Sequence, residues 1–361
     1  MTILVILALL LLLLMASIPV AIAILVLGLL VGFIFSSFPL HRVMGEIFWS
    51  ASTDFLLLAI PLFVLLGEVL LRAGIAKRTY SALDKWLSWL PGGLMHANIG
   101  TAAMFAATSG SSVATAATIS TVALPQARRY GYREGFFAGT IAAGGTLGIL
   151  IPPSINLIVY GFLTNTSIPQ LFMAGIVPGV LLAIVFMLVI LAICLVKPDM
   201  GGGQRSATWQ ERFASLKDLL PVLFIFAVVI GSIYAGWATP TESAALGVIA
   251  SVVLALRYKA VNGGFIKEVM EGTMRTTAMI MLILISANYL NFVLDAVGMA
   301  EMLKQFVTHL GLSPMKTLLV IIAMYVVLGL FVETLSLMVI TVPIVTPVII
   351  SSGFDPVWFG I

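Results

Sequence analysis

Long runs of apolar residues alternate with short polar segments along the chain. Leu4 to Phe33, Leu171 to Val196 and Leu219 to Ala238 reach or exceed the roughly 20 residues that a helix needs to cross a bilayer. The pattern predicts an all-α polytopic membrane protein. We expect spans near residues 2–16, 18–36, 54–73, 135–162, 171–196, 218–237, 240–257 and 276–298.

Two further apolar stretches, about 93–125 and 315–350, are interrupted by polar residues or prolines. Each is predicted to form a re-entrant helical hairpin, which enters and leaves the membrane on the same side. Segments 39–53 and 261–275 are amphipathic, and we expect them to lie at the membrane interface as arm helices.

The second half of the chain repeats landmarks of the first half in the same order, about 222 residues later. Chance similarity between apolar segments would not keep that order. The pairs are Ile18-Pro19-Val20 with Thr239-Pro240-Thr241, Gly74 with Gly298, Leu124-Pro125 with Thr346-Pro347, Gly131-Tyr132 with Gly353-Phe354, and Phe136-Phe137 with Trp358-Phe359.

The repeat predicts the domain organisation. Residues 1–197 are expected to hold scaffold helices, an arm helix, the first hairpin and a broken helix at about 135–162. Residues 198–217 form a polar cytoplasmic linker with the triplet Gly201-Gly202-Gly203, a helix-breaking signal. Residues 218–361 form the second repeat, which stops where the first repeat has Gly139 and is therefore incomplete. We interpret this as truncation; the alternative is a second half that is truly shorter.

Charge predicts the orientation of the spans, because cytoplasmic loops are enriched in Lys and Arg. With the N-terminus outside, only Arg42, Lys304 and Lys316 lie outside, and the other 15 of the 18 basic residues are cytoplasmic. The first hairpin is then cytoplasmic and the second is on the outer side. The two repeats are therefore expected to be inverted, a recurrent design of secondary transporters.

Composition supports membrane embedding, since 61% of residues are hydrophobic and only 9% are charged, against about 25% charged in soluble domains. The N-terminal run lacks the basic start of a secretory signal, so we expect it to be retained. The single cysteine, Cys194, is expected to be a small buried or lipid-facing residue. A net charge of +3, with the basic residues at membrane edges, indicates no nucleic-acid partner.

A segment rich in small polar residues, Thr108 to Thr118, lies at the expected tip of the first hairpin. Irregular backbone at membrane depth persists only where it is buried in protein or lines a wet cavity. Hydroxyl and carbonyl oxygens suit a small cation such as sodium, and helix N-termini at the break favour an anionic group. The alternative is that these small residues only allow close helix packing.

A second segment, Gly144 to Asn156, contains the pair Pro152-Pro153 in the middle of an apolar run. Paired prolines remove backbone donors and break a helix, and a cation is a good partner for the freed carbonyls. The glycines are not a nucleotide-binding loop, because no Lys-Ser or Lys-Thr follows them. A proline kink without a ligand is the alternative.

The third segment, Gly329 to Ser336, is the repeat counterpart of the serine segment and contains Glu333. A carboxylate within an apolar stretch is costly and usually functional. Glu333 could bind a cation, carry a proton, or organise the hairpin tip by hydrogen bonding. Glu242, just after Pro240, is better explained by stabilisation of a helix start. Asn288 and Asn291 are weaker site candidates, and no two of the three histidines have metal-ligand spacing.

Taken together, these segments resemble the large membrane subunit of TRAP transporters, the tripartite ATP-independent periplasmic transporters of the DctM family. The resemblance covers nearly the whole chain and also includes Ile60-Pro61-Leu62-Phe63 with Gly67-Glu68, Leu90-Pro91-Gly92-Gly93-Leu94 with Ala97-Asn98-Ile99, Gly175 to Gly179, and Gly236 to Ser243. Members of the family normally continue past this end with a second paired-proline segment.

The resemblance implies a sodium-coupled importer of organic acids, such as four-carbon dicarboxylates or sialic acid, in the bacterial inner membrane. It implies an elevator motion, a periplasmic substrate-binding protein of the DctP type, and a small membrane subunit of the DctQ type. Sodium is the coupling ion, and no other metal, cofactor or enzymatic activity is expected. Membrane lipid surrounds the protein.

The resemblance also assigns residues. The expected sodium-binding residues are Ser109, Ser112, Gly145, Gly148 and Pro152 at one site, and Gly329, Glu333 and Thr334 at a second. The expected substrate-binding residues are Ser111, Thr115, Asn156 and Asn288.

Two alternatives remain from the sequence. A solitary ion-coupled carrier, such as a sodium/proton antiporter, would have a similar serine-rich tip but would need no binding protein. A membrane enzyme or scaffold is disfavoured, because the sequence shows no nucleophile–base pair, metal cluster or paired catalytic carboxylates.

Overall fold

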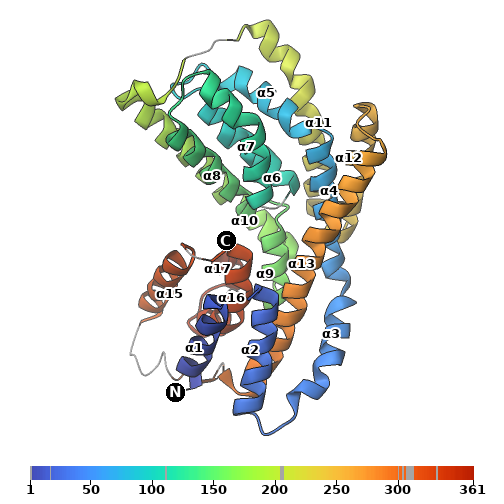
Figure 1. The fold of residues 1–361 in the computed structure, drawn as a ribbon, viewed down its shortest axis with the longest axis vertical. Coiled ribbons are helices and arrows are strands. Elements are labelled where there is room, and N and C mark those ends of the chain that lie inside the picture. The colour runs from blue at the N-terminus through green and yellow to red at the C-terminus, as the bar shows by residue number, and fades with distance from the viewer. Residues whose placement is uncertain are drawn as a thin grey trace. The chain divides into compact units, whose positions relative to one another are not determined.

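A computed structural model describes residues 2–16, 18–109, 112–203, 207–299, 301–302, 305, 313–330 and 332–361, and every regular element in these ranges is helical (Figure 1). The elements are α1 (Thr2–Met15), α2 (Val20–Phe35), η1 (Leu40–Val43), α3 (Met44–Ser52), η2 (Phe55–Leu58), α4 (Ala59–Arg72), α5 (Ile75–Leu87), α6 (Leu94–Ser109), α7 (Ser112–Arg129), α8 (Glu134–Leu150), α9 (Ile155–Thr164), α10 (Ile168–Val196), η3 (Pro198–Met200), α11 (Trp209–Tyr234), α12 (Pro240–Arg257), α13 (Gly263–Ala296), α15 (Pro314–Leu328), α16 (Thr334–Ser351) and α17 (Pro356–Gly360).

Six helical segments among the described residues are long and apolar enough to cross a membrane. The pair α8 and α9, bent by 41° at a short break, forms a seventh if it counts as one span. The all-α polytopic membrane fold is thereby confirmed. The six segments are Phe55–Arg72, α10, α11, α12, α13 and α16.

Helix starts follow the sequence repeat. Helix α7 begins at Ser112 and α16 begins at Thr334, 222 residues later. Helix α8 begins at Glu134 and α17 begins at Pro356, again 222 residues later. Both predicted hairpin regions consist of two consecutive helices, α6 with α7 and α15 with α16.

Two expected boundaries differ from the structure. The predicted arm 261–275 and span 276–298 form one continuous helix of 34 residues, α13, because no glycine or proline interrupts the chain between Gly272 and its end. Helix α11 begins at Trp209, inside the predicted linker. The Thr208 side chain accepts from the backbone N–H of Glu211, and the Glu211 carboxylate accepts from that of Thr208, a capping box that fixes this start.

The same motif begins α12 and confirms the structural role of Glu242. Its carboxylate accepts from the backbone N–H of Thr239 at 2.8 Å, and the Thr239 hydroxyl oxygen accepts from the backbone N–H of Glu242 at 3.3 Å. Cys194 is buried within α10, as expected.

The chain divides into two compact units. Unit 1 comprises Met1–Leu57, Val159–Ser167 and Arg275–Gly360, and unit 2 comprises Leu58–Ile158, Ile168–Met274 and Ile361. In unit 1, Gly28 of α2 packs on the ring of Tyr289 in α13. The hydroxyl of Tyr160 donates to the backbone carbonyl of Pro356 at 2.7 Å and ties α9 to α17.

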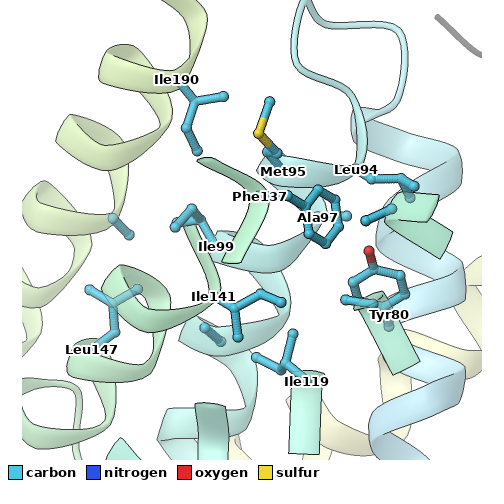
Figure 2. Packing of buried hydrophobic residues seen from close by; sticks show 14 of the residues in the cluster. Tyr80, Leu94, Met95, Ala97, Ile99, Ile119, Phe137, Ile141, Leu147 and Ile190 are labelled. Carbon is cyan, nitrogen blue, oxygen red and sulfur yellow. The ribbon is translucent and has the colours of Figure 1, made fainter. Parts of the chain in front are cut away.

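The core of unit 2 is formed by α6, α7 and α8. Figure 2 shows Ile99 of α6, Ile119 of α7 and Ile141 of α8 gathered in one buried cluster, with Phe137 of α8 beside them. The Phe137 ring meets that of Tyr132 edge-on, with centroids 5.1 Å apart. Because these side chains come from three helices, they hold both arms of the first hairpin against α8.

Candidate functional site

The break between α8 and α9 leaves backbone carbonyls without their usual donors. Helix α8 ends at Leu150 and α9 begins at Ile155, and the bond between Pro152 and Pro153 is cis. Since proline has no N–H, neither proline can donate to the carbonyl four residues earlier, which belongs to Gly148 or Ile149.

Side-chain chemistry satisfies one of these two carbonyls. The hydroxyl of Ser154 donates to the carbonyl oxygen of Ile149 at 2.5 Å. Gly148 and Pro152 are buried, so the Gly148 carbonyl lies where water is scarce. A carbonyl in such a place is a good ligand for a cation.

Two glycines allow α8 to pack closely against both arms of the first hairpin. A Cβ atom built on Gly144 would lie 2.9 Å from the Cβ of Ala102 in α6. One built on Gly145 would lie 2.8 Å from the Cβ of Ala116 and 3.1 Å from the carbonyl oxygen of Ser112, both in α7. The contacts at 2.9 and 2.8 Å are shorter than real Cβ contacts and the contact at 3.1 Å is unusually tight, so a larger residue at either position would require α8 or its neighbours to shift. The structure thus brings Ser112 and Gly145, two of the expected sodium-binding residues, close together.

The other predicted residues of the first hairpin are only partly described. Ser112 is half-buried at the start of α7, and Thr115 is buried one turn later. Ser109 is the last residue of α6, but its side chain lies outside the described residues, as does the whole of Ser111. The tip therefore combines the C-terminus of one helix with the N-terminus of the next.

The predicted substrate residues do not gather within one unit. Thr115 and Asn156 are buried in unit 2, and Asn156 lies in the first turn of α9. Asn288 is half-buried in unit 1, on the continuous helix α13 rather than at a helix break.

At the second predicted sodium site, Glu333 acts as the N-cap of α16. Its carboxylate accepts from the backbone N–H of Ser336 at 3.1 Å. Gly329, Glu333 and Thr334 are exposed in unit 1. The hydroxyls of Tyr325 and Thr341, 2.7 Å apart, join α15 to α16. Of the three roles considered for Glu333, hydrogen bonding that organises the tip is the one this geometry displays.

One polar contact beside the site was not predicted. The amide of Asn98 in α6 donates to the Thr140 hydroxyl of α8 at 2.8 Å, and that hydroxyl donates to the Phe137 carbonyl at 2.7 Å. Both side chains are buried. The sequence signal for this contact was a polar Asn in an otherwise apolar hairpin arm. Its partner could not be identified from the sequence, because Thr140 lies 42 residues away.

The donor set defines what the first site can bind. Among the described residues, no group of three His, Cys, Asp or Glu side chains could hold a metal ion. Near the break, α7 and α8 offer hydroxyl and backbone carbonyl oxygens and no carboxylate. Such neutral, hard ligands fit a small cation of low charge better than a transition metal.

Comparison with known proteins gives a consistent result. Residues 6–361 match the family model of the "Tripartite ATP-independent periplasmic transporter, DctM component". The chain is 35% identical to the C4-dicarboxylate TRAP transporter large permease protein DctM of Pseudomonas aeruginosa, over 92% of this chain and 78% of that protein. It is 33% identical to the sialic acid TRAP transporter large permease protein SiaM of Vibrio cholerae, over 90% and 75%. It is 31% identical to the 2,3-diketo-L-gulonate TRAP transporter large permease protein YiaN of Escherichia coli, over 89% and 75%.

The close packing of α8 at Gly145 predicts that two Gly→Ala substitutions in this helix change stability in different ways. Gly145→Ala forces α7 away and should lower the free energy of unfolding by about 1–3 kcal/mol. Gly139→Ala, at an exposed position with nothing within 4 Å of the new Cβ, should leave stability unchanged or raise it by up to about 1 kcal/mol. Denaturant unfolding in detergent micelles measures both. Equal effects of the two substitutions would contradict the packing described.

Proposed function

The chain belongs to the DctM family of large TRAP transporter permeases, and from this premise we propose that it is the transport subunit of a sodium-coupled, binding-protein-dependent importer of organic acids. Membership of this family makes it a multi-pass inner-membrane transport protein and not an enzyme. Sodium coupling, the binding protein and the substrate class are our proposal.

The observation that carries the sodium proposal is the approach of α7 to the broken helix. Because Gly145 has no side chain, the Ser112 carbonyl can lie close to α8. Three residues further along α8, the Gly148 carbonyl has no backbone donor from residue 152, because that residue is a proline. We assign Ser109, Ser112, Gly145, Gly148 and Pro152 to a site that would hold a sodium ion. The inward sodium gradient would supply the driving force for uptake.

An organic acid is the substrate class that the relatives and the local electrostatics favour. The three relatives above are named for a C4-dicarboxylate, sialic acid and 2,3-diketo-L-gulonate, all of which bear a carboxylate. Helix α7 begins at the hairpin tip, and the positive end of a helix dipole attracts an anion. We propose that Ser111, Thr115, Asn156 and Asn288 contact the substrate.

The partners follow from the same assignment. We propose a periplasmic binding protein of the DctP type that delivers the acid and a small membrane subunit of the DctQ type that braces the scaffold. We also propose an elevator motion, in which one group of helices carries the site across the membrane.

Uptake into proteoliposomes tests the function as a whole. With the small membrane subunit present, labelled dicarboxylate or sialic acid should accumulate only when an inward sodium gradient and the cognate binding protein are both supplied. Uptake driven by sodium without any binding protein would instead support a solitary carrier.

The sodium site can be tested within α7 by a matched pair of serines. Ser112→Ala removes a hydroxyl at the proposed site and should raise the half-saturating sodium concentration by about tenfold. Ser120→Ala removes a hydroxyl that already donates to the Ala116 carbonyl at 2.7 Å, so it should leave sodium dependence unchanged. The readout is the initial uptake rate against sodium concentration. Identical sodium curves for the two variants would argue against the Ser112 hydroxyl as a ligand, since the substitution leaves the Ser112 backbone carbonyl in place.

Glu333→Gln separates a charge role from a capping role. The Gln side-chain oxygen can still accept from the Ser336 N–H, so the cap is retained while the charge is lost. If Glu333 contributes to a second sodium site, the substitution should raise the half-saturating sodium concentration by about tenfold while thermal stability stays the same. Unchanged sodium dependence would leave Glu333 with the capping role alone.

A further inference from the structure

A pocket of about 220 Å³ lies in unit 1, and none of the residues assigned to sodium or substrate lines it, although Asn288 directly precedes Tyr289 of its wall. It is formed where α2 ends and η1 begins, by residues between Leu29 and His41 together with Tyr289 of α13. The charge-based orientation places this end of α2 at the outer membrane interface, where lipid headgroups lie.

Gly28 brings α2 close to Tyr289, and Gly32, one turn later, lines the pocket. A Cβ on Gly28 would lie 3.0 Å from the ring of Tyr289, so α2 packs closely on α13 at this point. One turn later, a Cβ on Gly32 would meet Val293 and Leu40 only at 3.7 and 3.8 Å. Because Gly32 has no side chain, space remains between the end of α2 and Tyr289.

Tyr289 contributes a buried polar side chain to the pocket wall. Tyr289 is fully buried, and its hydroxyl has no hydrogen-bond partner among the described residues. A buried polar group without a partner is costly, so a ligand that supplies one is stabilised. His41 stacks on Phe33 with ring centroids 5.1 Å apart, which fixes the imidazole at the rim.

The rim combines positive charge with exposed apolar surface. Arg42 follows His41 in η1, is exposed, and takes part in none of the ion pairs found in the described part of the chain. Phe33 and Phe38, which line the pocket, are 65% and 76% exposed. A guanidinium next to apolar surface at a membrane interface matches a molecule that has both a phosphate and a hydrocarbon part.

We propose that this pocket binds an anionic phospholipid. Its phosphate contacts His41 and Arg42, its glycerol region hydrogen-bonds with the Tyr289 hydroxyl, and its acyl chains cover Leu29 and Phe33. Free phosphate shares the headgroup chemistry but would leave the apolar wall uncovered, so the lipid is the favoured occupant.

Binding of dioctanoyl-phosphatidylglycerol to the purified full chain in detergent tests the proposal. The competing probes are dioctanoylglycerol, which lacks the phosphate, and inorganic phosphate, which lacks the chains. Arg42→Gln should weaken phosphatidylglycerol binding by about tenfold. Tyr289→Phe, which removes only the hydroxyl, should weaken it by about fivefold. Lys316→Gln, at an exposed residue that is also expected on the outer side, is the matched control and should leave binding unchanged.

A measurement on the unmodified chain keeps the test independent of variant folding. A photoreactive phosphatidylglycerol should cross-link within residues 29–41 or near Tyr289, and excess dioctanoyl-phosphatidylglycerol should suppress the cross-link. Cross-links confined to other segments would overturn the proposal. So would equal binding of inorganic phosphate or dioctanoylglycerol, or wild-type affinity in both Arg42→Gln and Tyr289→Phe.

Discussion

A backbone carbonyl inside an apolar span must have a partner, and the pair Pro152-Pro153 removes donors from two of them. The Ser154 hydroxyl compensates for the loss at Ile149. The Gly148 carbonyl loses its donor because Pro152 has no N–H, and no hydroxyl among the described residues compensates in the way that Ser154 does at Ile149. The proposed sodium site depends on this unequal compensation, because a helix with all its carbonyls paired would offer a cation no ligand.

The freed carbonyl becomes part of a site only because α8 lies against both arms of the first hairpin. Gly144 permits contact with α6, and Gly145 permits contact with α7 at the Ser112 carbonyl. The buried Asn98–Thr140 hydrogen bond also holds α6 against α8, one turn before Gly144. Packing and chemistry are thus coupled, since a methyl group at Gly145 would displace the Ser112 carbonyl oxygen that α7 provides.

The repeat keeps helix positions but changes the chemistry at the two hairpin tips. Helices α7 and α16 begin 222 residues apart, so Glu333 occupies the position of Ser111. The first tip offers neutral oxygens, whereas the second offers a carboxylate that caps its own helix. Inversion of the repeats in the membrane remains a prediction from the distribution of Lys and Arg.

Sequence pattern predicted the elements better than their contacts. Apolar runs, prolines and polar tips located the hairpin helices and the broken helix, because these signals are local. The continuity of α13 was missed, since a change from amphipathic to apolar character does not itself break a helix. The roles of Gly145 and Asn98 depend on neighbours about 30 to 40 residues away, and a single sequence does not give those pairings.

Hydrogen–deuterium exchange with and without sodium tests the central claim most directly. If a sodium ion joins the start of α7 to the broken helix, sodium should slow amide exchange in residues 112–118 and 144–156, whereas the same concentration of potassium should not. Helix α12 lies outside the proposed sites and serves as the internal reference. Unchanged exchange in both segments, or equal protection by potassium, would contradict a sodium site at this position.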